Sequence, residues 1–393
     1  MVIVLIVLMG VGALIWLVRI GLVWHFARAV PALPEHPPTD AQEDAPRVTI
    51  IVPAKDEADN IGPCVTSLLA QTYPNLRIIV VDDRSEDGTG DIVADLADGG
   101  DRLTLVRNAD LPAGWTGKCH AIRQGVTHAD GDWLLFTDAD TVHAPGCVAS
   151  AVAFACKEGV DLLTLLPAVR AERACERMLQ PCLSTTFLSL FPPSLVNRPT
   201  HRLAFCNGQF YLIRRALYDR LGGHEAVRRE FLEDMALGRK AKASGARVCV
   251  ASGGDLVAVR MYRGFRALWH GWSRIFFGCG RSGAVLAVWM LLSVLATVLP
   301  AAVLAGGAVA LALGAGGWRV WAPIGLAALQ FALMAPCMAR LYRMARCDRR
   351  YLPLHPAATA VCVAILANAL RLKWFARRIT WRGTVYAKQR QSA

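Results

Sequence analysis

Two short apolar runs, RVTIIVP at residues 47–53 and LRIIVVD at residues 76–82, decide the fold of this chain. Both are rich in β-branched residues, and each is followed by a polar turn and then a helical pattern, at residues 58–71 and 90–97. Further strands are expected at residues 102–107, 132–137 and 160–166, and a further helix at residues 118–126. This alternation predicts an α/β domain with a Rossmann-like, mostly parallel sheet.

Polar clusters follow three of the predicted strands, at Pro53 to Asp59, Asp82 to Asp87 and Asp138 to Asp140. Any one cluster is explained as helix capping, but three on one rim carry more acid than capping needs. Ligands of open parallel sheets bind outside the carboxyl ends of the strands. We therefore favour a cation-assisted site for a phosphorylated ligand. Asp138 and Asp140 are the expected ligands of Mg²⁺ or Mn²⁺, because side chains at i and i+2 of an extended segment share one face.

Composition indicates a membrane protein with a soluble domain. The 393 residues are 54% hydrophobic and only 19% charged, with a mean hydropathy of +0.35. The net charge is +12, yet the stretch from Arg340 to the end alone holds twelve Lys and Arg against one acid. Because the rest is nearly neutral, a nucleic-acid partner is not expected. The twelve cysteines form no C-x-x-C pair, so they indicate no zinc or redox motif and fit a reducing compartment.

The first 26 residues are expected to form a transmembrane anchor, since residues 1–18 carry no charge. A cleavable signal peptide is the alternative, but the basic stretch that normally precedes its apolar core is missing, while Arg19, His25 and Arg28 follow. These charges place the next segment in the cytoplasm by the positive-inside tendency. A linker is expected at residues 27–46 and the soluble domain at 47–280.

Transmembrane helices are expected again within residues 281–372. Charge-free or nearly charge-free runs at 284–313 and 320–339 predict a helical hairpin, whereas the apolar run at 355–370 is marginal in length for a span. A third span would place the basic tail, residues 373–393, outside the cell. A re-entrant or interfacial segment would keep that tail in the cytoplasm against anionic lipid. We favour a cytoplasmic tail, and the sequence leaves open whether residues 355–370 span the membrane.

Four motifs then carry a resemblance to a known family. They are VPAKDE at residues 52–57, VDDRSEDGT at 81–89, DAD at 138–140 and ED at 233–234. In this order and spacing they resemble the pattern of family 2 glycosyltransferases, over roughly residues 45–280. GWTGK at 114–118 and WRG at 381–383 look like the membrane-anchored members that glycosylate lipids, among them hopanoid, carotenoid and ceramide enzymes.

The resemblance implies a GT-A fold that binds a nucleotide-diphosphate sugar with a divalent cation. Carried over by motif, the residues expected to line the nucleoside pocket are Pro53, Glu57, Asp82 and Asp83. Asp138 would lie near the ribose or sugar, and Asp140 would hold the metal at the diphosphate. Lys118 is a partner for the donor phosphates in this interpretation, although a surface position is an equal alternative.

On the acceptor side, the resemblance assigns Asp234 as the general base, with Glu233 as the substitute. Inverting sugar transfer needs a carboxylate that takes the proton of the attacking hydroxyl. The alternative is that both acids compensate charge at a helix N-terminus. Gly208, in the sequence NGQF, resembles an acceptor-side turn where backbone approaches the ligand closely.

Two stretches, residues 173–196 and 264–278, are expected to lie at the membrane interface. The first combines large apolar side chains with few charges, and the second combines Trp, Phe and Arg. Processive members of the family carry Q-x-x-R-W in the second stretch, but this chain has WHGWSR at residues 269–274. Trp272 and Arg274 remain candidates for contact with the acceptor or the diphosphate.

The sequence therefore predicts a multi-pass protein of the plasma (inner) membrane with a cytoplasmic catalytic domain. The predicted activity is inverting, metal-dependent transfer of one sugar from a nucleotide-diphosphate sugar, expected to be a UDP-sugar, to a lipid hydroxyl. A processive polysaccharide synthase of the same fold is one alternative. A catalytically silent membrane scaffold or lipid-binding subunit is another.

Overall fold

The computed structural model describes residues 2–34, 45–97, 100–279, 282–375, 378–381 and 384–387. The chain divides into two compact units, each considered by itself. The α/β unit comprises residues 29–170, 191–261 and 377–393, and the helical unit comprises residues 1–28, 171–190 and 262–376.

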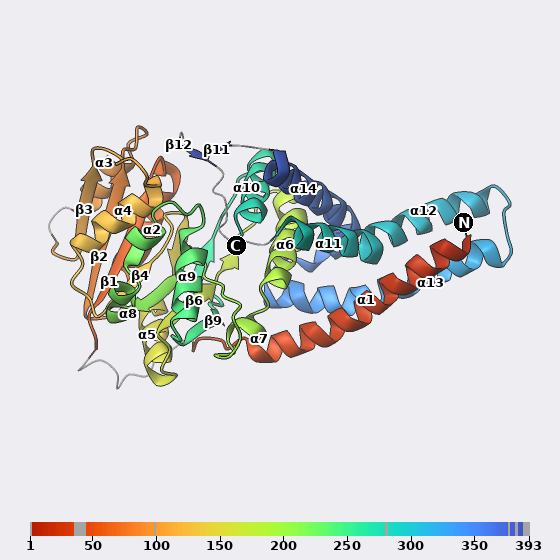
Figure 1. Ribbon diagram of the computed structural model, residues 1–393, viewed down its shortest axis with the longest axis horizontal. Helices are drawn as coiled ribbons and strands as arrows, with labels where there is room; N and C mark the ends of the chain where they lie inside the picture. Colours follow the sequence, from red (N-terminus) through yellow and green to blue (C-terminus); the bar gives the residue numbers. More distant parts are fainter. Residues whose placement is uncertain are drawn as a thin grey trace. The chain divides into compact units, whose positions relative to one another are not determined.

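A seven-stranded sheet with the order β3-β2-β1-β4-β8-β6-β9 organises the α/β unit (Figure 1). Its strands are β1 (Val48–Ala54), β2 (Leu76–Asp83), β3 (Leu103–Asn108), β4 (Trp133–Phe136), β6 (Leu162–Leu166), β8 (Tyr211–Arg214) and β9 (Val248–Ser252). The parallel pairs are β1 with β2, β1 with β4, β2 with β3, and β6 with β9. Strand β8 lies between β4 and β6 and runs antiparallel to both. The predicted α/β class with a mostly parallel sheet is confirmed.

Apolar side chains on both faces explain why the first strands read as continuous hydrophobic runs. Ile50 and Val80 belong to the large core on one face, together with Ile61 of α2. On the other face, Ile79 and Val81 pack against Ala121 of α4. The helices of this unit are α2 (Ala58–Leu69), α3 (Thr89–Leu96), α4 (Gly117–Thr127), α5 (Cys147–Lys157), α7 (Pro193–Val196), α8 (Arg215–Arg220), η2 (Gly223–Val227) and α9 (Glu233–Ala243).

Smaller sheets complete the α/β unit, and the sequence interpretation did not include them. Strand β10 (Val257–Val259) pairs with β5 (Thr141–His143) and with β7 (Ala168–Val169), and β11 (Arg378–Trp381) pairs with β12 (Thr384–Ala387). Most of the expected linker, residues 35–44, lies outside the described residues, as does the end of the tail from residue 388. Before that gap, the Pro31 carbonyl accepts a hydrogen bond from the Ser252 N–H at 2.8 Å.

Among the described residues, the helical unit contains four segments that are long and apolar enough to span a membrane: Val2–His25, Gly283–Ala312, Trp318–Met344 and Arg349–Phe375. Its helices are α1 (Val2–Ala29), α6 (Ala174–Leu190), α10 (Phe265–Gly278), α11 (Gly283–Ser293), the π-helix η3 (Val294–Val298), α12 (Leu299–Ala312), α13 (Trp318–Met344), η4 (Arg349–Leu354) and α14 (His355–Phe375). The last apolar run, which was marginal in the sequence, thus continues as helix to Phe375.

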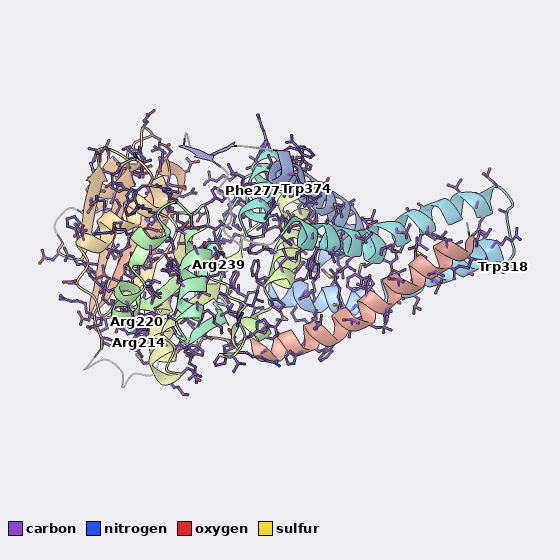
Figure 2. All side chains as sticks on the ribbon, in the orientation of Figure 1. Arg214, Arg220, Arg239, Phe277, Trp318 and Trp374 are labelled. Carbon is purple, nitrogen blue, oxygen red and sulfur yellow. The ribbon has the colours of Figure 1, made fainter. Side chains whose placement is uncertain are left out.

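Outward-facing aromatic and aliphatic side chains on these segments fit contact with lipid. Trp318, at the start of α13, and Trp374, near the end of α14, are 59% and 58% exposed (Figure 2). Inside the unit, by contrast, Trp16 is fully buried and its indole N–H donates to the Ala296 carbonyl at 2.7 Å. That carbonyl lies in η3, where the backbone follows the wider i→i+5 hydrogen-bond pattern of a π-helix.

Candidate active site

The three predicted polar clusters meet at one edge of the sheet, because β2, β1 and β4 are neighbours whose carboxyl ends coincide. Hydrogen bonds join the loops after β1 and β2. The Asp56 N–H donates to Ser85 Oγ at 3.0 Å, the Glu86 N–H donates to Asp56 Oδ1 at 3.0 Å, and the Ala58 N–H donates to Asp87 Oδ2 at 2.9 Å. Asp87 therefore builds the loop scaffold, as capping would predict for a single cluster.

The residues expected to line a nucleoside pocket lie on these two loops. Pro53 is near the end of β1, and the Glu57 N–H donates to Thr89 Oγ1 at 2.8 Å. Asp82 and Asp83 are 6% and 3% exposed. The Arg84 guanidinium reaches Asp83 with Nη2 to Oδ2 at 2.9 Å and Nε to Oδ1 at 3.1 Å. Arg84 was not predicted as a site residue, although its place beside two buried aspartates was a usable signal.

Lys118 is in the first turn of α4 and joins the second half of the site. Its Nζ lies 2.7 Å from Asp138 Oδ1 and 2.7 Å from Glu233 Oε1. Thr116 caps this helix by accepting the Cys119 N–H at 3.3 Å. The side chain of Lys118 thus connects the DAD motif with the ED motif, instead of projecting freely from the surface.

The DAD motif adopts a turn, and the expectation of an extended segment is wrong. The Thr141 hydroxyl donates to the Asp138 carbonyl at 2.7 Å and so closes the chain between β4 and β5. The Thr137 hydroxyl, 2.8 Å from that of Thr141, fixes the same turn by donating to the Gln209 carbonyl at 2.8 Å. The two aspartates consequently have different environments: Asp138 pairs with Lys118, and the buried Asp140 Oδ1 has no hydrogen-bond partner.

This donor set fits a hard divalent cation. Burial, followed by the charges of Asp138 and Glu57, raises the pKa of Asp140 well above its ordinary value, so a cation would satisfy both the unpaired oxygen and the excess negative charge. Within the described part of the chain, no group of three or more His, Cys, Asp or Glu residues forms a complete protein cage for a metal. Mg²⁺ and Mn²⁺ commonly bind through one or two carboxylates and the phosphates of a substrate.

Asp234 is at the start of α9, beside Gly208. Its Oδ2 accepts the Gly208 N–H at 2.6 Å, and its Oδ1 accepts the Met235 N–H at 2.6 Å. A Cβ on Gly208 would lie 2.9 Å from Lys118 Nζ and 3.1 Å from Asp234 Oδ2. Only glycine leaves this space open, so the Gly208 backbone lies among these charged side chains. The predicted close approach of this backbone to a ligand stays a prediction.

The charged side chains around Gly208 have opposite effects on one another's pKa values. Burial, and then the adjacent Glu233 carboxylate, raises the pKa of Asp234 to about 7, while Lys118 acts in the other direction. Desolvation alone would lower the pKa of Lys118, but Asp138 and Glu233 outweigh it and raise that pKa well above its usual value. The arrangement therefore offers a permanent ammonium and a carboxylate whose pKa suits a general base near neutral pH.

Trp272 and Arg274 belong to the helical unit, whereas the residues of the acidic group belong to the α/β unit. The Trp272 side chain is 3% exposed between α10 and α6, where its indole N–H donates to Gln180 Oε1 at 3.1 Å and its ring packs near Phe187 and Phe276. Arg274 is half-buried on the same helix. Both helices expected at the interface, α6 and α10, are in the unit that holds the long apolar helices. A role of either side chain with a substrate stays a prediction.

The sheet order and its acidic edge define a GT-A-like α/β domain accompanied by long apolar helices. Residues 49–222 match the sequence profile of glycosyl transferase family 2. This stretch is thus similar to family 2 glycosyltransferases, which agrees with the resemblance drawn from the motifs. The solved structure of a mannosyltransferase from Pyrobaculum calidifontis, in complex with GDP-Man and Mn²⁺, shares the fold with a TM-score of 0.53 and 21% identity, over 94% of this chain and 99% of that one.

Curated relatives include the 4,4'-diaponeurosporenoate glycosyltransferases of Staphylococcus aureus. The protein of strain MRSA252 is 31% identical over 232 residues, which cover 58% of this chain and 60% of the relative. The protein of strain USA300 is 30% identical over 243 residues with the same coverage. The chain thus spans about three fifths of the length of these carotenoid glycosyltransferases.

Proposed function

We propose that this protein transfers a single sugar, with inversion, from a nucleotide-diphosphate sugar to the hydroxyl of a membrane lipid. The observation that carries the proposal is the group of side chains around Gly208, in which Lys118, Asp138 and Asp234 converge within contact distance of one backbone position. This group contains an acid–base carboxylate, a cation and one end of a metal motif. A UDP-sugar is the donor that we expect.

Each residue has a defined task in this proposal. The nucleoside is bound by Pro53, Glu57, Asp82 and Asp83. The divalent cation, Mg²⁺ or Mn²⁺, would be held by Asp138 and Asp140. A bound divalent cation supplies charge neutralisation to the diphosphate. Asp234 accepts the proton of the acceptor hydroxyl while the oxygen of that hydroxyl forms a bond to the anomeric carbon. The bond from that carbon to the phosphate oxygen breaks, and the nucleoside diphosphate departs with the electron pair.

The acceptor and the location follow from the helical unit. The four candidate spans among the described residues support membrane association, and the name of the relatives supports a lipid-like acceptor. We propose a multi-pass protein of the plasma membrane with its catalytic domain in the cytoplasm, because Arg19, His25 and Arg28 follow the first apolar run. The amphipathic helices α6 and α10 would then lie at the interface, where they would meet the acceptor.

A lipid carboxylate is the second candidate acceptor, because the relatives' name denotes the salt of an acid. A carboxylate attacks without losing a proton, so it would not need Asp234 as a base, and its product would be an ester. Mild alkali cleaves a glycosyl ester but leaves a glycoside intact. The stability of the product in alkali therefore distinguishes the two acceptors.

The test is transfer by detergent-purified protein, supplied with Mn²⁺ or Mg²⁺, radiolabelled UDP- and GDP-sugars and a host lipid extract. Label in one alkali-stable lipid of the organic phase is the expected result. Label in a long water-soluble polymer would favour the processive synthase. Nucleotide binding without turnover, with every donor and with the host lipids present, would favour the silent scaffold.

A further inference from the structure

The ammonium group of Lys118 lies between the DAD and ED motifs, where it can compensate the negative charge of both. Its ammonium is 2.7 Å from both Asp138 Oδ1 and Glu233 Oε1. The Glu233 side chain is only 4% exposed, so solvent does little to stabilise its charge. The α/β unit thus already holds one positive charge at the aspartate that the proposed metal site shares.

A divalent cation and this ammonium cannot both use Asp138 freely. A metal within bonding distance of the Asp138 carboxylate would lie a few ångströms from Lys118 Nζ, where two positive charges repel each other. Asp140 Oδ1 offers an unpaired oxygen, but one carboxylate is a weak site for Mg²⁺ or Mn²⁺. The described residues provide no third protein ligand in a metal-binding group.

A donor diphosphate changes this balance in two ways. Its oxygens supply the missing ligands for the cation, and its negative charge gives Lys118 an alternative partner to Asp138. Binding of the metal and binding of the donor would then favour each other, and by reciprocity the effect is equal in both directions.

We infer that Lys118 is a built-in competitor of the divalent cation, which keeps the metal site weak until the nucleotide donor binds. This inference rests on the proposed function, since it concerns the same donor site. It also assigns Lys118 a second task, because the residue holds Glu233 in place through the ion pair in the donor-free protein.

The experiment measures Mn²⁺ binding to the full-length, nucleotide-free protein in detergent, by the electron paramagnetic resonance signal of free Mn²⁺. Lys118→Met is expected to bind Mn²⁺ at least about tenfold more tightly than the wild type, because the competing charge is gone. Lys118→Arg keeps the charge and should bind as weakly as the wild type. Lys240→Met, on the exposed side of α9, is the matched control and should also match the wild type.

A folded Lys118→Met protein with wild-type Mn²⁺ affinity would overturn the inference. If that variant does not unfold cooperatively, Lys118→Gln, which keeps a polar side chain, takes its place under the same criterion. Repeating the titration with UDP and with GDP separates the two proposals. The competitor role predicts that nucleotide strengthens Mn²⁺ binding more in the wild type than in Lys118→Met. No effect of either nucleotide on any variant, together with no sugar transfer, would contradict the proposed function and the strengthening of the metal site by the donor. Tighter Mn²⁺ binding by nucleotide-free Lys118→Met than by the wild type would still support the competition between Lys118 and the cation.

Discussion

The Gly208 N–H donates to Asp234 Oδ2 at 2.6 Å, which fixes the carboxylate of α9 against the turn that precedes β8. A second backbone N–H, from Met235, holds Oδ1 at 2.6 Å. Two backbone donors orient the carboxylate without a side-chain partner that competes for its proton. Such an orientation suits a base that must face an incoming hydroxyl.

Asp234→Asn should abolish transfer to a hydroxyl acceptor while donor binding is preserved. Loss of a positioned general base commonly lowers the rate by about 10²- to 10⁴-fold. Donor affinity, measured by calorimetry with UDP, and kcat, measured by lipid labelling, give the two readouts. Asp95→Asn, an exposed acid on α3, is the matched control and should retain full activity. Normal turnover by Asp234→Asn would remove this residue from the mechanism.

The rate should also depend on pH through the same carboxylate. Because the pKa of Asp234 is raised to about 7, the base is protonated below that pH and can accept no proton. Activity with a hydroxyl acceptor should therefore fall as the pH drops from 8 to 6, a range chosen to bracket that pKa. With a carboxylate acceptor, the rate should not fall in this way as the pH drops. A rate that is independent of pH at constant donor saturation would therefore favour the second acceptor class.

Asp140→Asn should remove the metal-supported part of donor binding. The variant loses one negative charge at the unpaired Oδ1, and we expect at least about tenfold weaker UDP binding in Mn²⁺ but little change in EDTA. Calorimetric titrations of wild type and variant in both buffers provide the measurement. Equal donor affinity of the two proteins in Mn²⁺ would exclude Asp140 as a metal ligand.

Gly208→Ala should slow catalysis with little effect on stability. The new methyl group would lie 2.9 Å from Lys118 Nζ and 3.1 Å from Asp234 Oδ2, so both groups must move. A displacement of about 1 Å can cost as much as 10²-fold in rate. Gly62→Ala on α2 is the control, since its Cβ would meet only Ile92, at an ordinary 3.6 Å. Equal kcat values for the two variants would show that the space around Gly208 has no catalytic importance.

Local patterns predicted the sheet edge because its parts are close in sequence. The β-branched runs of β1 and β2 and the acids that follow them are contiguous, and parallel pairing brings their ends together. The contact of Lys118 with Glu233 was not predictable in this way, because 115 residues separate them and no local period relates them. The turn at Asp138 depends on hydroxyl groups of Thr137 and Thr141, which no motif identifies.

The same limit applies inside the helical unit. Hydropathy identified apolar runs, but it could not show that the Met9 carbonyl accepts a hydrogen bond from Gln330 Nε2 at 2.9 Å. Nor does it show Arg19 lying near the rings of both Trp16 and Trp289. Periodicity reports which side chains are apolar, whereas packing decides which polar groups those helices bury together.

Trp16→Phe should therefore destabilise the helical unit through one hydrogen bond. Phenylalanine keeps most of the buried ring but cannot donate a hydrogen bond to the Ala296 carbonyl in η3, and we expect this loss to cost about 1–2 kcal/mol. For a chain of this size we expect the thermal unfolding midpoint in detergent to fall by about 2–5 °C. Trp318→Phe, at a residue that is 59% exposed, loses no such bond and should unfold like the wild type. Equal midpoints for the two variants would mean that the π turn satisfies its carbonyl without Trp16.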